Sequence, residues 1–257
     1  MAYEQMLAPV LEKQALAKNI YRMVLQCRSI AQKAEPGQFV HLLPTGCTLR
    51  RPISICEINK SAGTLTIVFE VKGSGTDALA NVRVGENLDI LGPLGRGFTI
   101  LPDAKHVVVV GGGIGNPPML SLAQVYGARA TAICGFRSAN IVTLQDAFHA
   151  SGAETILCTD DGTAGRHALV TEPLKEQLSG GGVDMVYACG PRPMLKFVAA
   201  AAKEYGVRCE VSMEERMGCG IGACLVCACA LKSENGETRY GHVCKDGPVF
   251  NAEEVEW

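Results

Sequence analysis

Four cysteines near the C-terminus have the types and spacing of an iron–sulfur ligand set. The first three follow the pattern C-x4-C-x2-C, and the fourth comes after sixteen intervening residues. The four are Cys219, Cys224, Cys227 and Cys244. This is the plant-type spacing of a 2Fe-2S cluster, so we expect single-electron transfer. Gly218, Gly220 and Gly222 let backbone N–H groups approach such a cluster without a Cβ in the way.

A structural zinc site and disulfides are the alternative interpretations of these cysteines. Zinc sites usually present paired C-x2-C knuckles, whereas here the first interval is four residues and the last cysteine is isolated. Most of the twelve cysteines are solitary within apolar runs, as Cys134 and Cys158 are, and are interpreted as small buried hydrophobes. Cys229 remains an alternative third ligand, although the plant-type interval favours Cys227.

Two glycine-containing loops indicate nucleotide binding. The segment VVVVGGGIGNPPML predicts a strand, a loop from Gly111 through Gly112, Gly113 and Ile114 to Gly115, and a helix beginning near Pro117. The positive end of a helix dipole and free N–H groups suit a pyrophosphate. The loop departs from G-x-G-x-x-G, so a tight turn stays an alternative. The segment YACGPRPML supplies a second loop after a later strand.

Two further loops of the N-terminal part could hold phosphates. Arg51-Pro52-Ile53-Ser54 combines a fixed positive charge with a hydroxyl, and Gly73-Ser74-Gly75-Thr76 offers small residues and a helix cap. An arginine before a strand is more often a solvated charge. A phosphate-binding role is favoured for both loops because they precede a dinucleotide loop and a cluster motif in the same chain.

Changes in periodicity divide the chain into segments 1–100, 101–211 and 212–257. The first has period-two patterns, such as Leu65, Ile67 and Phe69 on one strand face, and predicts a small antiparallel β-barrel. The predicted cuts between its strands are Pro36-Gly37, Asn59-Lys60, Gly73, Gly85 and Gly92-Pro93. The third segment has little periodicity and carries the cluster cysteines, so we expect metal binding to organise it.

The middle segment alternates between strand and helix patterns. Its predicted strands are 106–110, 130–136, TILCTD, DMVYACG and RCEVSM, and its predicted helices are 117–126, 172–178 and 194–205. This alternation predicts a parallel sheet covered on both faces. The expected fold class is therefore a multi-domain chain with an antiparallel β-barrel, an α/β parallel-sheet domain and a small C-terminal domain that carries the cluster cysteines; the family resemblance described below implies that the barrel is the FAD domain and the α/β part the NAD domain.

Composition restricts the possible functions and locations. The 257 residues are 47% hydrophobic and carry a net charge of −2, with no long basic run, which argues against a nucleic-acid partner. The sequence begins without a signal-peptide pattern, and no apolar run reaches about 18 residues. We therefore expect a cytoplasmic protein with no membrane partner, in a reducing compartment that suits unpaired thiols.

Electron counting explains why a flavin is expected. A nicotinamide exchanges two electrons at once and a 2Fe-2S cluster exchanges one, so a chain with both needs a carrier that works in either mode, as flavin does. The cofactors perform the chemistry, and we therefore assign no catalytic acid or base. The five histidines show no ligand or triad spacing and are interpreted as surface or satisfied structural residues; they are His41, His106, His149, His167 and His242.

The motifs RPIS, GSGT, GGGIG and CGPRPML, together with the cysteine set, resemble the ferredoxin-NADP reductase superfamily with a fused plant-type cluster domain. More narrowly, EERMGCGIGACLVCAC and HVCKDGPVF are similar to the family of electron-transfer subunits of NAD-dependent dihydroorotate dehydrogenase, over essentially the full chain. The resemblance implies FAD, NAD and a 2Fe-2S cluster facing a separate FMN-containing catalytic subunit, in a heterotetramer of two of each chain. Electrons would pass from dihydroorotate through FMN, cluster and FAD to NAD+, in pyrimidine biosynthesis.

The resemblance also implies roles for individual residues. Arg51, Pro52, Ile53 and Ser54 would contact the flavin and its phosphates, the backbone of Val68, Phe69 and Glu70 would run along the cofactor, and Gly75 and Thr76 would bind the pyrophosphate. The loop from Gly111 to Gly115 and the turn Cys189-Gly190-Pro191 would frame the nicotinamide dinucleotide. Cys189 either lies near the hydride-transfer site or closes a strand as a buried residue. The family often has a basic residue near position 70, which Lys72 could replace here.

Alternatives remain for the function and for nucleotide preference. The chain could instead be the small subunit of an NAD(P)H:ferredoxin oxidoreductase or a sulfide dehydrogenase, or a redox-sensing module without turnover. Asp160 and Asp161 could repel the 2′-phosphate of NADP, or they could cap the following turn.

Overall fold

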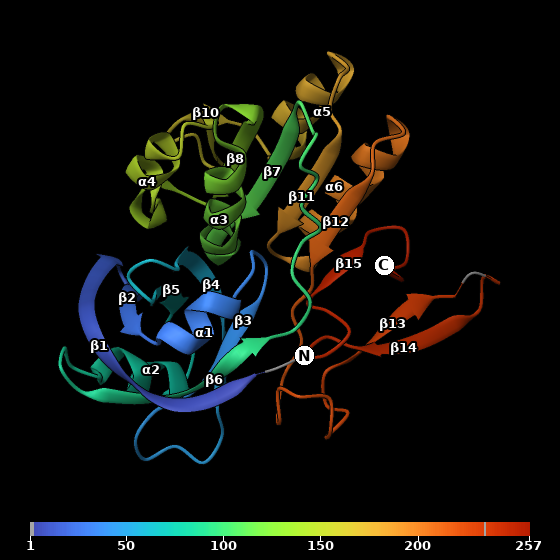
Figure 1. Cartoon of the computed structure of the whole chain (residues 1–257). Helices are drawn as coiled ribbons and strands as arrows, with labels where there is room; N and C mark the ends of the chain where they lie inside the picture. The colour runs from blue at the N-terminus through green and yellow to red at the C-terminus, as the bar shows by residue number, and fades with distance from the viewer. Residues whose placement is uncertain (1–2, 234) are drawn as a thin grey trace.

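The computed structural model describes residues 3–233 and 235–257. Figure 1 shows three parts in chain order: a barrel near the N-terminus, a sheet with helices above it, and a C-terminal hairpin and loops beside the barrel. The chain therefore combines a β-barrel with a parallel-stranded α/β sheet, as the periodicity predicted. The domain boundaries at 100/101 and 211/212 stay predictions.

The barrel is a closed antiparallel sheet in the order β1-β2-β5-β4-β3-β6. Its strands are β1 (Glu4–Ala17), β2 (Ile20–Gln26), β3 (Phe39–Leu43), β4 (Arg51–Asn59), β5 (Thr64–Glu70) and β6 (Asn87–Leu94), with helices α1 (Arg28–Lys33) and α2 (Ser74–Asn81). Leu65, Ile67 and Phe69 lie in its core, because alternate residues of a strand point to the same face.

The predicted cut at Gly92-Pro93 is wrong, because β6 runs through both residues to Leu94. Gly92 pairs with Glu4 of β1, and the pairing with β3 shifts register between Phe39 and His41. An irregularity of this kind accommodates a proline, which has no N–H for the ladder, inside a strand.

The second sheet has the order β10-β9-β8-β7-β11-β12-β15. Its strands are β7 (Val107–Gly112), β8 (Ala130–Phe136), β9 (Glu154–Thr159), β10 (Arg166–His167), β11 (Met185–Cys189), β12 (Cys209–Ser212) and β15 (Val249–Asn251). All neighbours are parallel except β15, which pairs antiparallel with β12. The strand order reverses at β7, so the loops after β7 and β11 lie at a topological switch point.

Helices cover both faces of this sheet, as predicted. They are α3 (Asn116–Tyr126), α4 (Gln145–Ala150), α5 (Thr171–Ser179) and α6 (Arg192–Glu204), joined by short 3-10 turns at Gly113–Gly115, Gly127–Arg129 and Ala139–Ile141. Buried residues of α3 pack on one face, and those of α5 and α6 pack on the other. Helix α4 and strand β10 had no counterpart in the sequence patterns, since each is at most six residues long.

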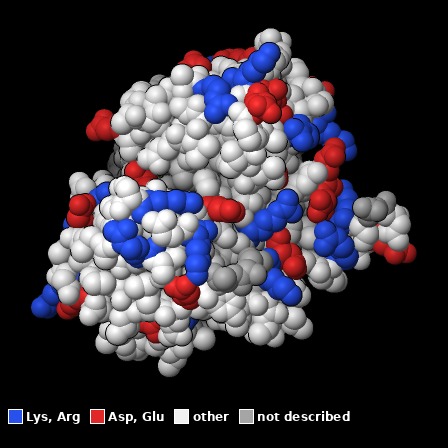
Figure 2. Space-filling view, in the orientation of Figure 1, with Lys and Arg blue, Asp and Glu red and all other residues white. Residues whose placement is uncertain are grey.

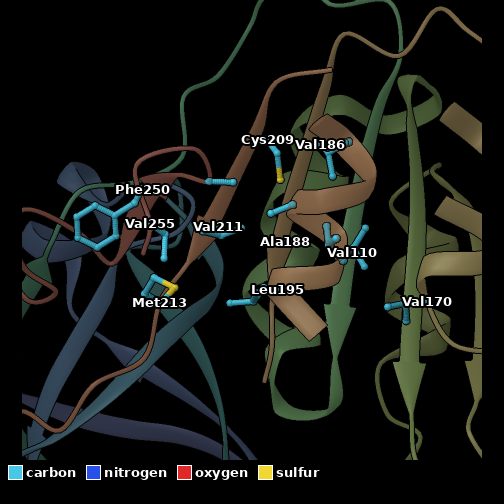
Figure 3. Close-up of a cluster of buried hydrophobic side chains, with 14 of the residues drawn as sticks. Val110, Val170, Val186, Ala188, Leu195, Cys209, Val211, Met213, Phe250 and Val255 are labelled. Atoms are coloured by element: carbon cyan, nitrogen blue, oxygen red, sulfur yellow. The ribbon is translucent and has the colours of Figure 1, made fainter. Parts of the chain in front are cut away.

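The C-terminal segment forms a hairpin and then returns to the sheet. Strands β13 (Ala228–Lys232) and β14 (Thr238–His242) pair with each other, and β15 follows. Figure 3 shows Phe250 and Val255 of this segment near Met213, with Leu195 and Ala188 on the other side of Val211. These residues belong to one buried cluster, so an apolar core as well as the cysteines organises the segment.

The surface carries charges of both signs. Figure 2 shows acidic and basic side chains interspersed on one face and separated by wide uncharged areas. Across the described ranges, no helix is both long and apolar enough to cross a membrane.

Candidate functional site

The four predicted cluster cysteines lie in two pairs within one loop region. The Cys219 amide donates to Cys224 Sγ and the Cys224 amide donates back to Cys219 Sγ, both at 3.4 Å. The Cys244 amide donates to Cys227 Sγ, also at 3.4 Å. The Gly222 amide joins the pairs by donating to Cys244 Sγ at 3.1 Å.

Backbone N–H groups concentrate on one of these sulfurs. Cys219 Sγ also accepts from the amides of Ile221 and Ala223, at 3.4 and 3.2 Å. Burial opposes ionisation, but the N–H groups of Ile221, Cys224 and Ala223 outweigh it and lower the pKa of Cys219 to about 6. Gly220 and Gly222 have φ values of +74° and +83°, a region that glycine enters without strain. The local backbone is thus shaped to stabilise negative charge on sulfur.

The donor set fits a two-iron cluster. Within 3–233 and 235–257, no three His, Cys, Asp or Glu side chains gather closely enough to hold a single metal ion. A plant-type 2Fe-2S cluster is held by four cysteine thiolates, two on each iron, so two neighbouring cysteine pairs match its ligand requirement. Cys219 with Cys224 and Cys227 with Cys244 would hold the cluster.

Cys229 lies apart from these contacts. Its side chain is 4% exposed within the apolar core, on β13 opposite Gly241. Burial raises the pKa of this thiol to about 11, with Glu215 acting in the same direction. Cys227 and Cys244 are equally buried, so burial does not separate the candidates; the contact of the Cys244 amide with Cys227 Sγ is what supports Cys227 as the third ligand.

A cavity of about 800 Å³ lies at the carboxyl ends of the sheet strands, where parallel sheets bind ligands. The structure brings to it these predicted residues: Glu70, Gly112, Gly113, Ile114, Gly115, Gly190 and Pro191. Ile20 and Lys72 of the barrel part also line it. Gly111 and Cys189 are buried beneath it and do not line it.

The glycines of the two loops allow close approach of the backbone. A Cβ at Gly112 would lie 2.4 Å from Met194 Sδ, and one at Gly115 would lie 2.3 Å from the Cys189 carbonyl oxygen. The Gly115 loop is therefore packed directly on the turn after β11. The cradle this leaves, with the N-terminus of α3 behind it, fits a dinucleotide pyrophosphate.

Asn116 fixes this loop and was missed by the sequence analysis. Its side chain is fully buried, and its Nδ2 donates to the carbonyls of Gly113 and Gly135 at 2.9 and 3.1 Å. A Cβ at Gly111 would come 2.2 Å from Asn116 Oδ1, so Gly111 makes room for this amide. Its position at the first turn of the helix, after GGGIG, is the signal that could have indicated it.

Several other cavity residues were also missed. They are Phe136, Arg137, Thr171, Met194, Phe197 and Glu214. Phe136 ends β8 and Arg137 follows it, at the same sheet edge as the glycine loops, so the end of the strand could have indicated both residues. Burial raises the pKa of Cys189 to about 12, and the Glu214 carboxylate adds to the shift.

The two barrel loops predicted to hold FAD meet in space. A Cβ at Gly75 would lie 1.8 Å from Arg51 Nε, so the guanidinium rests on this glycine. The Thr76 hydroxyl accepts from the amides of Lys72 and Gly73, at 2.8 and 3.2 Å, and caps α2. A cation beside a helix N-terminus suits a diphosphate, so these residues fit the FAD phosphates.

The remaining predicted flavin residues lie on neighbouring strands. Ser54 pairs with Phe39, and Pro52 and Ile53 are half-buried on β4. Val68 and Phe69 are buried in apolar clusters, and contact of their backbone with the flavin stays a prediction. Lys72 Nζ lies 3.4 Å from Glu70 Oε2, and both side chains line the cavity. The positive charge of Lys72 is thus paired with Glu70.

The two aspartates after β9 differ in environment. Asp160 lines the cavity, while Asp161 Oδ1 accepts from the amide and hydroxyl of Thr163 at 3.0 and 2.6 Å. Asp161 therefore caps the turn, and of the two aspartates only Asp160 lines the cavity.

The interpretation of the histidines is wrong for His41. This side chain is fully buried, and neither ring nitrogen has a hydrogen-bond partner among the described residues. Burial and the nearby Arg50 lower the pKa of His41 to about 4. Others follow the expectation, since His106 Nε2 lies 3.0 Å from the Thr131 hydroxyl and His242 lies 3.5 Å from Asp246. Sequence patterns could not detect His41, because its burial depends on a loop nearly 180 residues away.

Solved structures share this architecture. One, described as "Insights into flavin-based electron bifurcation via the NADH-dependent reduced ferredoxin-NADP oxidoreductase structure", has a TM-score of 0.87 and 28% identity, covering 98% of this chain and 90% of the other. Phthalate dioxygenase reductase, a modular structure for electron transfer from pyridine nucleotides to [2Fe-2S], has a TM-score of 0.64 and 17% identity, covering 94% and 77%. The latter likeness concerns the fold alone.

Curated relatives extend over nearly the whole chain. Residues 214–256 match the family model described as the iron-sulfur cluster binding domain of dihydroorotate dehydrogenase B. The dihydroorotate dehydrogenase B (NAD(+)) electron transfer subunit of Geobacillus sp. (strain WCH70) is 41% identical over 99% of both chains. That of Bacillus mycoides (strain KBAB4) is 41% identical over 96% of both. With its paired thiols, its nucleotide cavity and this degree of identity, the chain belongs to the family of dihydroorotate dehydrogenase B (NAD(+)) electron transfer subunits.

Proposed function

We infer that this chain is the electron-transfer subunit of an NAD-dependent dihydroorotate dehydrogenase and links a catalytic partner chain to NAD+ in pyrimidine biosynthesis. The observation that carries this function is the arrangement of two thiol pairs and a nucleotide cavity within one member of this family. When bound, the cluster supplies one-electron, FAD one- or two-electron and NAD two-electron chemistry.

The residues of the chain bind and orient these groups. Amides of the 219–224 loop direct N–H groups at cysteine sulfur and would stabilise negative charge there. Arg51 and the α2 N-terminus would hold the FAD phosphates, and the Gly112–Gly115 loop would hold the dinucleotide. None of these tasks requires a proton donor or acceptor, which agrees with the absence of an assigned catalytic acid or base.

The surface around the first cysteine pair suits a protein partner. Cys224 is exposed, and the apolar residues Ile221, Leu225 and Val226 beside it are 38%, 61% and 57% exposed. An apolar patch beside a redox centre favours docking of a protein. A partner that covers this patch also brings its own redox group close to the cluster. We propose that an FMN-containing dihydroorotate dehydrogenase catalytic chain docks here, with two copies of each chain in the complex.

The cysteines bear on location. All twelve are free thiols, with no disulfide among the described residues. Thiols persist in a reducing compartment, so we place the complex in the cytoplasm.

The test is reconstitution with the partner. Co-expression with an FMN-containing dihydroorotate dehydrogenase chain should give a stable complex with anaerobic dihydroorotate:NAD+ activity, whereas this chain alone should reduce ferricyanide with NADH. Leu225→Asp should abolish the coupled activity and leave dye reduction intact. Leu7→Asp, at an equally exposed position on β1, is the matched control. Absence of coupled activity with every such partner would exclude this function.

A second candidate is the small subunit of an NAD(P)H:ferredoxin oxidoreductase. The 28% identical structural relative favours it, since the likeness covers 98% of this chain. Ferredoxin-dependent reduction of NAD(P)+ by a co-purifying chain, without dihydroorotate oxidation, would identify this alternative. A chain that binds flavin and cluster but does not reduce ferricyanide would instead be a redox sensor.

A further inference from the structure

His41 lies on the outer face of the barrel, between the predicted flavin segment and the cluster loop. Its neighbours Val40 and Leu42 point into the barrel core, so His41 points outward. Within the β3–β4 ladder it stands directly opposite Pro52 of the RPIS segment. One strand pair therefore connects the position of this imidazole to the proposed flavin site.

The cluster loop covers the ring. A Cβ at Gly220 would lie 2.5 Å from His41 Nδ1, so the imidazole packs directly against the backbone beside Cys219. Gly220 has a φ of +74° and is buried, and both features permit this approach. On the barrel side, Arg50 donates to the His41 carbonyl at 3.1 Å and pairs with Asp89 at 2.9 Å. The position of the strand is thus fixed where it meets the loop.

The imidazole has an unused hydrogen-bonding capacity. The side chain is fully buried, and neither ring nitrogen makes a hydrogen bond of good geometry in the described part of the chain, although backbone groups of Cys219 and Arg50 lie close to the ring. A buried polar group without a partner is destabilising, so the imidazole is expected to have one in the loaded protein. In every protonation state the ring carries at least one N–H, and the nearest cluster-binding residue is Cys219.

We propose that His41 donates a hydrogen bond to a sulfur on the Cys219 side of the bound 2Fe-2S cluster, and that it is a positioning residue that sets the reduction potential of the cluster. This inference rests on the proposed cluster site. A donor to sulfur stabilises the reduced, more negative cluster and raises its reduction potential. Because His41 pairs across from Pro52, the same side chain holds the cluster at a fixed place relative to the flavin segment.

The test compares His41→Leu, which removes both ring nitrogens, with His41→Asn, which keeps an N–H donor. His242→Gln is the matched control, since His242 is two residues from Cys244 but is paired with Asp246. In the full complex, iron content, visible spectrum and EPR-monitored midpoint potential are measured. We expect a lower potential and altered g-values in His41→Leu, a smaller change in His41→Asn and no change in His242→Gln.

Two outcomes would overturn the proposal. One is an unchanged potential in His41→Leu at full iron content; the other is an equal shift in His41→Leu and His41→Asn, which would indicate packing alone. If His41→Leu loses its cluster, pulsed EPR of the wild-type protein labelled with 15N-histidine tests the hydrogen bond directly. Absence of a coupling between the reduced cluster and a histidine nitrogen would contradict the proposal. A wild-type chain that binds no cluster would refute the proposed function instead.

Discussion

The backbone of Gly115 lies against the carbonyl group of Cys189, so that a Cβ at position 115 would come 2.3 Å from that oxygen. The residue has an ordinary φ of −80°, and space alone requires glycine here. This contact holds the two nucleotide loops together at the switch point of the sheet.

Gly115→Ala should therefore weaken NADH binding. Overpacking costs about 1–3 kcal/mol, and separation of the loops should raise the KM for NADH about tenfold or more. Steady-state ferricyanide reduction checks this, with flavin and iron content expected to be normal. Gly180→Ala, where a Cβ has only ordinary contacts, is the control and should match the wild type. Equal KM values for the two variants would contradict this role of the contact.

Arg51→Gln should reduce FAD retention. The guanidinium lies over Gly75 at the start of α2, and a charged contact to phosphate contributes about 1.5–3 kcal/mol, so FAD affinity should fall roughly tenfold to a hundredfold. Flavin content after dialysis and fluorescence titration measure the loss. Arg83→Gln, an exposed arginine after α2, should keep its flavin. Full retention of FAD by Arg51→Gln would remove Arg51 from the site.

Asp160→Ser should improve the use of NADPH. Asp160 lines the cavity, so its negative charge would repel a 2′-phosphate, and its removal should raise the NADPH/NADH ratio of kcat/KM about tenfold. Asp161→Ser serves as the comparison, because Asp161 is engaged with Thr163. The preference for NADPH over NADH should change only in Asp160→Ser. A similar shift in both would indicate a change in the turn rather than a charge effect.

Cys189 should not contribute an ionisation to the pH–rate profile. Burial raises its pKa from 9.0 to about 12, so the thiol stays neutral and its thiolate is absent between about pH 6 and 9. Dye reduction by the wild type and by Cys189→Ala should follow the same profile over that range. A change in the wild-type rate near pH 8–9 that is absent from Cys189→Ala would contradict this prediction.

Cys227→Ala should lose the cluster, whereas Cys229→Ala should keep it. The amide of Cys244 donates to Cys227 Sγ, whereas no cluster cysteine shares a hydrogen bond with Cys229 among the described residues. Iron analysis and the EPR signal of the reduced protein distinguish the two variants. Cluster loss in Cys229→Ala alone would reverse the assignment.

Local patterns predicted the regular elements well. The predicted strand 130–136 coincides with β8, and the predicted helix 117–126 differs from α3 by one residue. Such elements carry their own periodicity and turn residues. Strand β15 carries no such signal, since its three residues form a strand only beside β12.

The sequence indicated the site residues where the backbone requires glycine or where cysteines have metal-ligand spacing. The site residues that the sequence analysis missed depend on distant contacts. Asn116 acts through Gly135 on another strand, and His41 is buried by Gly220. The sequence marks Asn116 only by its position after GGGIG, and it gives no local signal for His41, because each contact joins segments that only the folded chain brings together.

Strand β15 has a consequence for how the cluster segment is held. It completes the edge of the nucleotide sheet beside β12, and all four cluster cysteines lie between these two strands in the chain. The segment that carries the iron ligands is therefore a closed loop whose two ends are hydrogen-bonded neighbours, and those ends cannot separate unless the β12–β15 ladder breaks.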